Sequence, residues 1–152
     1  MHGLGMFLLK LLQYFFEIGN SGYRLVDLPG YGFAKVPDVV RKRWEQSLEE
    51  YFLKRKSLKG LILLMDIRHP LTPADWKMID WTTSMHLPVH ILLTKADKLT
   101  RGPALQTLHA VQKMLTAEKR IPAELVTVQL FSATAKQGIQ EALEKISIWL
   151  LS

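Results

Sequence analysis

The sequence has no cysteine among its 152 residues, so no disulfide bond can form. It also lacks a long apolar run. Residues 6–16 are largely apolar, but Lys10 and Gln13 interrupt them, and a membrane-spanning helix needs about 20 apolar residues. No Lys or Arg precedes this run and no small-residue cleavage site follows it, so the pattern does not indicate a signal peptide. We therefore expect a cytoplasmic protein without membrane contact.

The composition is that of an ordinary globular domain, with 48% hydrophobic and 22% charged residues. The net charge of +6 favours contact with a polyanion. Much of the basic character lies in two runs, residues 41–43 and residues 54–56, with Lys59 close behind. These runs fit two interpretations equally, a solvated helix face or a nucleic-acid-binding patch.

The pattern of apolar residues predicts alternating strands and helices. Residues 11–18 and 23–28 are strand-like, and the Gly and Asn of residues 19–22 favour an antiparallel hairpin between them. Apolar side chains recur every fourth residue from Val36 to Phe52, which predicts a helix. Residues 58–66 are typical of a strand covered on both faces of a mostly parallel sheet. The later elements expected are a helix capped by Thr72 that ends near Met85, strands at 89–94 and 125–131, and helices at 103–117 and 139–150.

Ligands of open α/β sheets bind beyond the carboxyl ends of the strands. The groups that follow the predicted strands at that edge are Asp27-Leu28-Pro29-Gly30, Asp66, Thr94-Lys95-Ala96-Asp97 and Phe131-Ser132-Ala133. The first, third and fourth of these groups fit one ligand, a guanine nucleotide. Asp66 has no role in this prediction beyond its place at a strand end.

Two of these groups suit the guanine base. A buried Asp97 carboxylate accepts from the N1–H and the exocyclic amine of guanine, a donor pair that adenine lacks. The apolar stem of Lys95 can lie over the base and ribose, and the Thr94 hydroxyl can brace the loop. A backbone N–H at Ser132-Ala133 can reach guanine O6. The alternatives are that Asp97 is a turn acid before a helix and that Ser132 is a helix cap.

The remaining group suits a phosphate. Gly30 and Gly32 allow a ligand to approach the backbone amides closely, and Pro29 stiffens the turn. Gly30 could donate its amide to the terminal phosphate while Asp27 accepts from a magnesium-bound water. Asp followed by Pro-Gly is also ordinary turn chemistry, so this group gains its weight from the other two.

Together these motifs and the stretch Asp66-Ile-Arg-His-Pro-Leu71 closely resemble the EngB family of bacterial GTP-binding proteins, from about Gln13 to the end of the chain. The resemblance implies a Ras-like P-loop GTPase fold, an α/β fold whose mostly parallel sheet carries one antiparallel edge hairpin. It also implies binding of GTP or GDP with Mg2+, and a role with ribosomal RNA in assembly of the large ribosomal subunit, needed for normal cell division and septation. The nucleotide-binding residues implied are Asp27, Leu28, Pro29, Gly30, Thr94, Lys95, Ala96, Asp97, Phe131, Ser132 and Ala133.

The resemblance also shows what the sequence lacks. Such GTPases hold the β- and γ-phosphates in a loop of the form Gly-x-x-x-x-Gly-Lys-Ser/Thr, and no such motif occurs in the 152 residues. We therefore expect residues 1–152 to be a single but partial G domain, truncated at its N-terminus, with the first strand, the phosphate loop and the direct magnesium ligands missing. Nucleotide binding should be impaired as a result.

Enzymatic activity is left open by this comparison. The residue after Gly30 is Tyr31, an aromatic that cannot activate water, so no residue is assigned a catalytic role. No residue is assigned as a direct metal ligand either. Two alternatives to a GTP-dependent switch remain, a nucleotide-free remnant that binds RNA or the ribosome, and a fragment without function.

Overall fold

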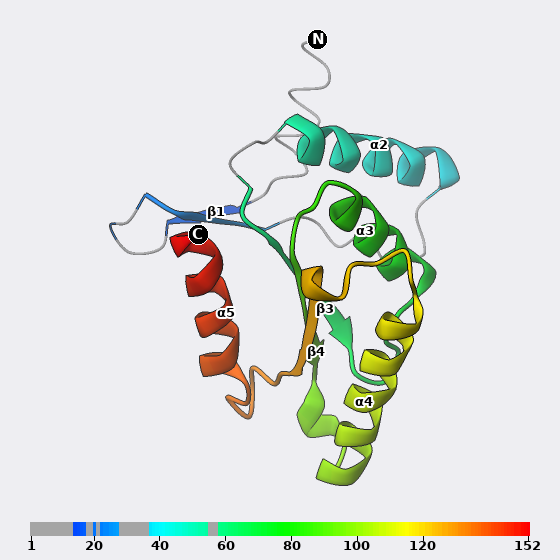
Figure 1. Ribbon diagram of the computed structural model, residues 1–152, viewed down its shortest axis with the longest axis vertical. Coiled ribbons are helices and arrows are strands. Elements are labelled where there is room, and N and C mark those ends of the chain that lie inside the picture. Colours follow the sequence, from blue (N-terminus) through cyan, green and yellow to red (C-terminus); the bar gives the residue numbers. More distant parts are fainter. Residues whose placement is uncertain (1–13, 18–19, 21, 28–36, 55–57) are drawn as a thin grey trace. The chain divides into compact units, whose positions relative to one another are not determined.

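The computed structural model describes residues 14–17, 20, 22–27, 37–54 and 58–152 (Figure 1). It divides the chain into two compact units, Met1–Lys56 and Ser57–Ser152. Each unit is described by itself. In the part of the chain described, no helix is both long and apolar enough to cross a lipid bilayer.

Among its described residues, the first unit contains an antiparallel hairpin and a helix. Strands β1 (Tyr14–Glu17) and β2 (Arg24–Asp27) pair so that Tyr14 lies opposite Asp27, which confirms the predicted hairpin. Gly22 before β2 has φ +78°, a conformation that glycine adopts without strain. Helix α2 (Asp38–Lys54) confirms the every-fourth-residue pattern, and its acidic first residue and basic last residue complement the helix dipole.

The second unit is built on a parallel sheet of order β3-β4-β5. The three strands are β3 (Leu61–Asp66), β4 (Val89–Thr94) and β5 (Val126–Leu130). The helices are α3 (Pro73–Ser84), α4 (Arg101–Ala117) and α5 (Ile139–Leu151), with short 3-10 turns at η1 (Ala96–Lys98) and η2 (Ala123–Leu125). Figure 1 shows α3 and α4 on one side of the sheet and α5 on the other. The predicted α/β architecture with a mostly parallel sheet is confirmed.

The start of α3 forms as the sequence indicates. Thr72 is the N-cap and its hydroxyl accepts from the Asp75 N–H at 3.3 Å, while the Asp75 carboxylate accepts from the Thr72 N–H at 2.8 Å. Pro73 occupies the first turn, where its missing N–H costs nothing. This capping box fixes where the chain leaves the loop after β3 and enters the helix.

Burial of β3 differs from the prediction. The strand was expected to be covered on both faces, but Leu64 is 59% exposed. In the parallel register Leu64 lies beside Leu92 of β4, which is only 6% exposed. Within the described residues β3 has a single strand partner, β4, so Leu64 has a neighbouring strand on one side only.

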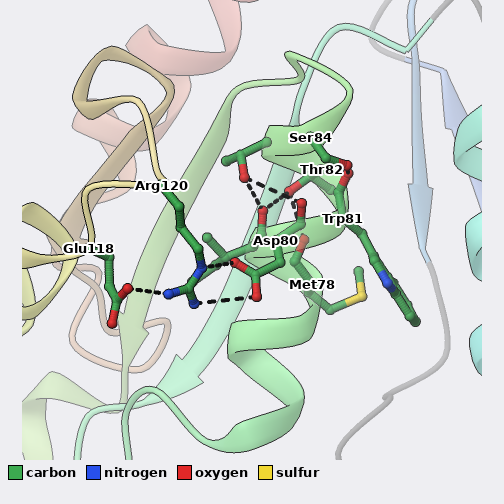
Figure 2. A network of polar contacts seen from close by, with 9 residues as sticks. Met78, Asp80, Trp81, Thr82, Ser84, Glu118 and Arg120 are labelled. Atoms are coloured by element: carbon green, nitrogen blue, oxygen red, sulfur yellow. Dashed lines mark hydrogen bonds and ion pairs between the residues drawn. The ribbon is translucent and has the colours of Figure 1, made fainter.

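An arginine joins the two helices on the opposite side of the sheet (Figure 2). Arg120 donates from Nε to the Asp80 carboxylate of α3 at 3.0 Å and also pairs with Glu118. Its guanidinium lies 5.7 Å from the centre of the Trp76 ring. All of these groups are partly exposed, so each contact contributes modestly to stability, but together they hold the end of α4 near α3.

A buried histidine, His90 of β4, lies on the α5 side of the sheet. It is 2% exposed, and its ring meets the Trp149 ring of α5 edge-on with centroids 6.5 Å apart. Burial lowers the pKa of His90, and the Lys145 charge adds to this while Gln129 and Glu141 oppose it. The lowered pKa favours the neutral imidazole in the folded chain at neutral pH.

We expect the free energy of unfolding to fall as the pH is lowered from about 7.5 to about 5.5. In this range His90 binds a proton in the unfolded chain but stays neutral when it is buried in the folded chain. The slope from this one group is at most about 1.4 kcal/mol per pH unit. Denaturant titrations at several pH values measure it. The His90→Phe variant should show a flatter dependence than the wild type, whereas His109→Gln, at an exposed histidine of α4, should keep the full dependence. Equal slopes in all three chains would contradict the assignment.

Candidate functional site

The loops after β4 and β5 lie side by side at the carboxyl edge of the sheet. The Phe131 N–H donates to the Leu93 carbonyl at 2.9 Å, and the Ala96 N–H donates to the Phe131 carbonyl at 3.1 Å. These bonds continue the ladder of the parallel sheet beyond the last strand residues. The two sequence groups predicted to hold a guanine base are thus brought together by the register of the strands.

The central contact of this site joins Ser132 to Asp97. Ser132 is fully buried, and its hydroxyl donates to Asp97 Oδ1 at 2.7 Å while accepting from the Ala135 N–H at 3.1 Å. The hydrogen bond from Ser132 holds the pKa of Asp97 below its usual range, with smaller contributions from Lys98 and Thr134. The carboxylate is therefore ionised at neutral pH with one oxygen fixed in place.

The exposure of Asp97 corrects one expectation. Asp97 was expected to be a buried carboxylate, but its side chain is exposed. Asp97 lies in η1, beyond Thr94, the last residue of β4. Any penalty for an unpaired Asp97 thus arises only when a base itself covers the carboxylate.

Residues 132–137 form a short closed loop. The Ser132 N–H donates to the Gln137 carbonyl at 3.0 Å and the Gln137 N–H returns a bond to the Ser132 carbonyl at 2.9 Å. The amide of Ser132 is therefore already used within the loop. Of the two amides predicted to reach guanine O6, that of Ala133 is the better candidate, and its small side chain is exposed.

Thr94 and Lys95 are fixed by β3. The Thr94 hydroxyl donates to the Met65 carbonyl at 3.1 Å. It was expected to brace the loop after β4, but it bonds to the neighbouring strand β3 instead. Lys95 has φ 58°, in the left-handed region, and its ammonium lies 3.4 Å from the Asp66 carboxylate. A long side chain in this position runs across the strand ends with its apolar stem free to cover a ligand.

Asp66 and Arg68 form a pair that the sequence argument did not assign to the site. Arg68 donates to the Asp66 carboxylate from its backbone N–H at 2.9 Å, from Nε at 3.0 Å and from Nη2 at 2.8 Å. These bonds, with a further one from Lys95, hold the pKa of Asp66 well below its usual range. The spacing Asp-x-Arg is the only sequence signal for this pair. Arg68 fixes the Asp66 carboxylate, and this carboxylate in turn orients the Lys95 ammonium.

The residues predicted to contact the phosphates lie at the end of β2 and directly after it. Asp27 ends β2 opposite Tyr14, but its side chain lies outside the described residues, as do Leu28, Pro29, Gly30 and Tyr31. Among the residues that the structure does describe, no cluster of three His, Cys, Asp or Glu side chains could hold a metal ion.

The chain is similar over most of its length to curated GTP-binding proteins. It is 53% identical over 127 residues to the probable GTP-binding protein EngB of Acinetobacter baumannii, covering 84% of this chain and 58% of that protein. It is 49% identical over 137 residues to the probable GTP-binding protein EngB of Azoarcus sp. strain BH72, covering 90% of this chain and 64% of that protein. Over these residues the chain belongs to the EngB family. No protein-family model matches it.

Solved structures show the same fold. A probable EngB crystal structure superposes with a TM-score of 0.69 at 15% identity, over 93% of this chain and 89% of that one. Elongation factor SelB of Methanococcus maripaludis, solved with the GTP analogue GppNHp, superposes with a TM-score of 0.63 at 18% identity, over 99% of this chain and 31% of that one. Both likenesses confirm the P-loop GTPase fold. The chain spans about 58–64% of the length of its two curated EngB relatives.

Removal of the Ser132 hydroxyl gives a direct test of the contact between Ser132 and Asp97. We expect Ser132→Ala to raise the pKa of Asp97 toward its ordinary value, because the main hydrogen bond that stabilises the carboxylate is lost. Titration of the carboxyl carbon by NMR measures the change. Thr134→Ala removes a lesser contribution and should raise this pKa by a smaller amount. An unchanged pKa in Ser132→Ala would contradict the geometry.

Proposed function

We propose that this EngB-family chain binds guanine nucleotides through the loops after β4 and β5. The observation that carries the proposal is the 2.7 Å hydrogen bond from buried Ser132 to Asp97, which orients an ionised carboxylate at the carboxyl edge of the sheet. Guanine offers an N1–H and an exocyclic amine on one edge, and an ionised carboxylate accepts both. Adenine offers no such pair, so it would cover Asp97 without satisfying it.

Other residues complete the recognition of the base. In this proposal the Ala133 N–H donates to guanine O6 and the stem of Lys95, whose ammonium lies 3.4 Å from the Asp66 carboxylate, covers the base. The small side chain at Ala133 leaves room for a flat ring. In this arrangement hydrogen bonds select the purine and apolar contacts cover it. Small-molecule sites commonly combine a few polar groups for specificity with apolar surface.

The described residues fit the base better than the phosphates. The 152 residues contain no Gly-x-x-x-x-Gly-Lys-Ser/Thr motif to supply an amide cradle and lysine for the phosphates. Magnesium, when bound to a nucleotide, supplies positive charge that neutralises the phosphates. We therefore expect base selectivity with weak overall affinity, and we assign no hydrolytic step to this chain.

The biological role proposed for the chain is that implied by the EngB resemblance. This is a cytoplasmic role in assembly of the large ribosomal subunit, in contact with ribosomal RNA and needed for normal cell division and septation. Support comes from the sequence identity to the two EngB proteins and from the net charge of +6. The single partial G domain over residues 1–152 also remains part of this proposal.

Base selectivity tests the binding function. Unlabelled GDP, inosine diphosphate and ADP are each titrated against a fluorescent GDP on the purified chain. We expect GDP to compete best and inosine diphosphate, which lacks the exocyclic amine, to compete more weakly. ADP should hardly compete at all. Equal competition by all three nucleotides would refute guanine recognition.

A second candidate function is RNA binding by the first unit. The observation that favours it is the run Arg41, Lys42 and Arg43, all three exposed on α2. Arg41 pairs with Asp38 on the same helix, which reduces its free charge. Binding of an RNA to this helix should weaken steeply as salt is added, because phosphate neutralisation releases counterions. Salt-independent binding would exclude this mode.

A further inference from the structure

The loop of residues 132–137 is anchored to the core by a side chain outside the nucleotide motifs. Gly138 follows the loop and precedes α5, with φ +79°. A Cβ at this position would lie 2.3 Å from the Leu130 carbonyl oxygen and 2.6 Å from Gln129 Nε2, so the backbone here is pressed directly against β5. The return of the loop to the sheet is therefore tightly defined.

Gln129 of β5 makes the contact that closes the loop. Its side chain is 1% exposed, and Nε2 donates to the Gly138 carbonyl at 2.7 Å and to the Leu130 carbonyl at 3.1 Å. Two carbonyl partners fix the amide orientation, because only the NH2 group can donate to both. The other amide atom, Oε1, must then accept.

His90 satisfies that acceptor from the neighbouring strand. His90 Nε2 lies 2.7 Å from Gln129 Oε1, and His90 Nδ1 lies 2.7 Å from the Thr127 hydroxyl. Because Oε1 accepts, Nε2 carries the proton of the neutral ring and Nδ1 accepts from Thr127. A single directed chain of hydrogen bonds thus runs from Thr127 through His90 and Gln129 to Gly138.

We propose that Gln129, held in place by His90, is a positioning residue for the purine-recognition loop and keeps the Ser132 hydroxyl against Asp97. The loop is tied at its start by the bonds of Phe131 to Leu93 and Ala96, and at its end by Gln129. Naming this loop as purine-binding rests on the proposed function. The positioning role concerns the loop and Asp97 themselves.

The physical reason is the cost of leaving buried groups unpaired. An apolar residue at position 129 removes the donor to Gly138 and strips His90 Nε2–H of its acceptor. The Gly138 carbonyl keeps its bond from the Ala142 N–H of α5 at 3.1 Å but loses its bond to β5, so the end of the loop is no longer fixed to the sheet and Ser132 is held less firmly against Asp97. Gln129 and His90 have all their side-chain hydrogen bonds satisfied in this arrangement, and no other arrangement of these two side chains has a similar energy.

The test compares Gln129→Met and His90→Phe with Val111→Ala, a control at a fully buried residue of α4. Amide hydrogen exchange is followed at Ser132, Ala135 and Gln137, whose N–H groups are bonded within the loop. We expect these three amides to exchange about tenfold faster in the two network variants than in a control of equal global stability. Equal acceleration across the whole sheet, or an unchanged loop, would overturn the proposal.

A second readout separates positioning from simple loss of stability. In Gln129→Met the pKa of Asp97 should rise, as in Ser132→Ala, whereas Val111→Ala should leave it unchanged. An unchanged Asp97 pKa in Gln129→Met would overturn the positioning role. If the loop and the pKa respond but the wild type shows no guanine selectivity, the proposed function fails and the positioning role stands.

Discussion

Replacing Asp97 with Asn is expected to lower the preference of the chain for guanosine over adenosine nucleotides by at least about 100-fold. The carboxylate accepts two hydrogen bonds from guanine, and an Asn side chain offers only one acceptor and places an NH2 donor against the guanine amine. Xanthine carries a carbonyl where guanine carries that amine. The same variant should therefore bind xanthosine nucleotides better than the wild type does.

Competition against a fluorescent guanosine nucleotide measures the change. Asp80→Asn is the matched control, because Asp80 of α3 is also a solvent-accessible carboxylate of the second unit but pairs with Arg120. It should leave base selectivity unchanged. If Asp97→Asn retains the wild-type ratio of guanosine to adenosine binding, Asp97 does not read the base.

The second large effect concerns the phosphates. We expect the 152-residue chain to bind GDP at least about 1000-fold more weakly than a GTPase that has the complete phosphate loop, because several charge-assisted hydrogen bonds to the phosphates are not supplied. Guanosine without phosphates should then bind nearly as well as GDP. Added magnesium should change the affinity little.

A titration with fluorescent GDP, with and without magnesium, measures this affinity. Guanosine serves as the control ligand because it retains the base and ribose alone. A dissociation constant between nanomolar and low micromolar would contradict the expectation, as would a large gain in affinity on adding magnesium. Either result would mean that phosphate-binding groups exist beyond the motifs recognised in the sequence.

Much of the fold could be predicted from local sequence patterns. The every-fourth-residue spacing predicted α2, and the Thr72-Pro73-Ala74-Asp75 stretch predicted the start of α3 together with its capping box. Both features depend on residues close in sequence, where the physical chemistry of a helix is local. The hairpin β1-β2 was predictable for the same reason.

The exposure of Leu64 could not be predicted from its own segment. A near-continuous apolar run indicates burial on both faces, but actual burial depends on which elements pack against the strand. Here β3 lies at the edge of the described sheet, and Leu64 remains 59% exposed. Local apolar character therefore showed that the strand exists but not how fully it is covered.

The motifs of the candidate site could be predicted from the sequence, but the residues that hold its loop in place could not. The groups that contain Asp97 and Ser132 were expected at one edge of the sheet because each follows a parallel strand, but the 2.7 Å hydrogen bond between these two side chains was not predicted. The part played by Gln129 depends on strand register and on a contact with Gly138 nine residues further along the chain. His90 reaches Gln129 from the neighbouring strand, 39 residues away in sequence. Such contacts carry no short-range sequence signal.

The most direct measurement of the central claim is an NMR titration of the whole chain with GDP. The account predicts that chemical shifts change first and most at residues 94–98 and 131–138, around the Asp97–Ser132 hydrogen bond, and that ADP at the same concentration leaves them unchanged. Shifts confined to α2, or equal shifts with GDP and ADP, would contradict the account.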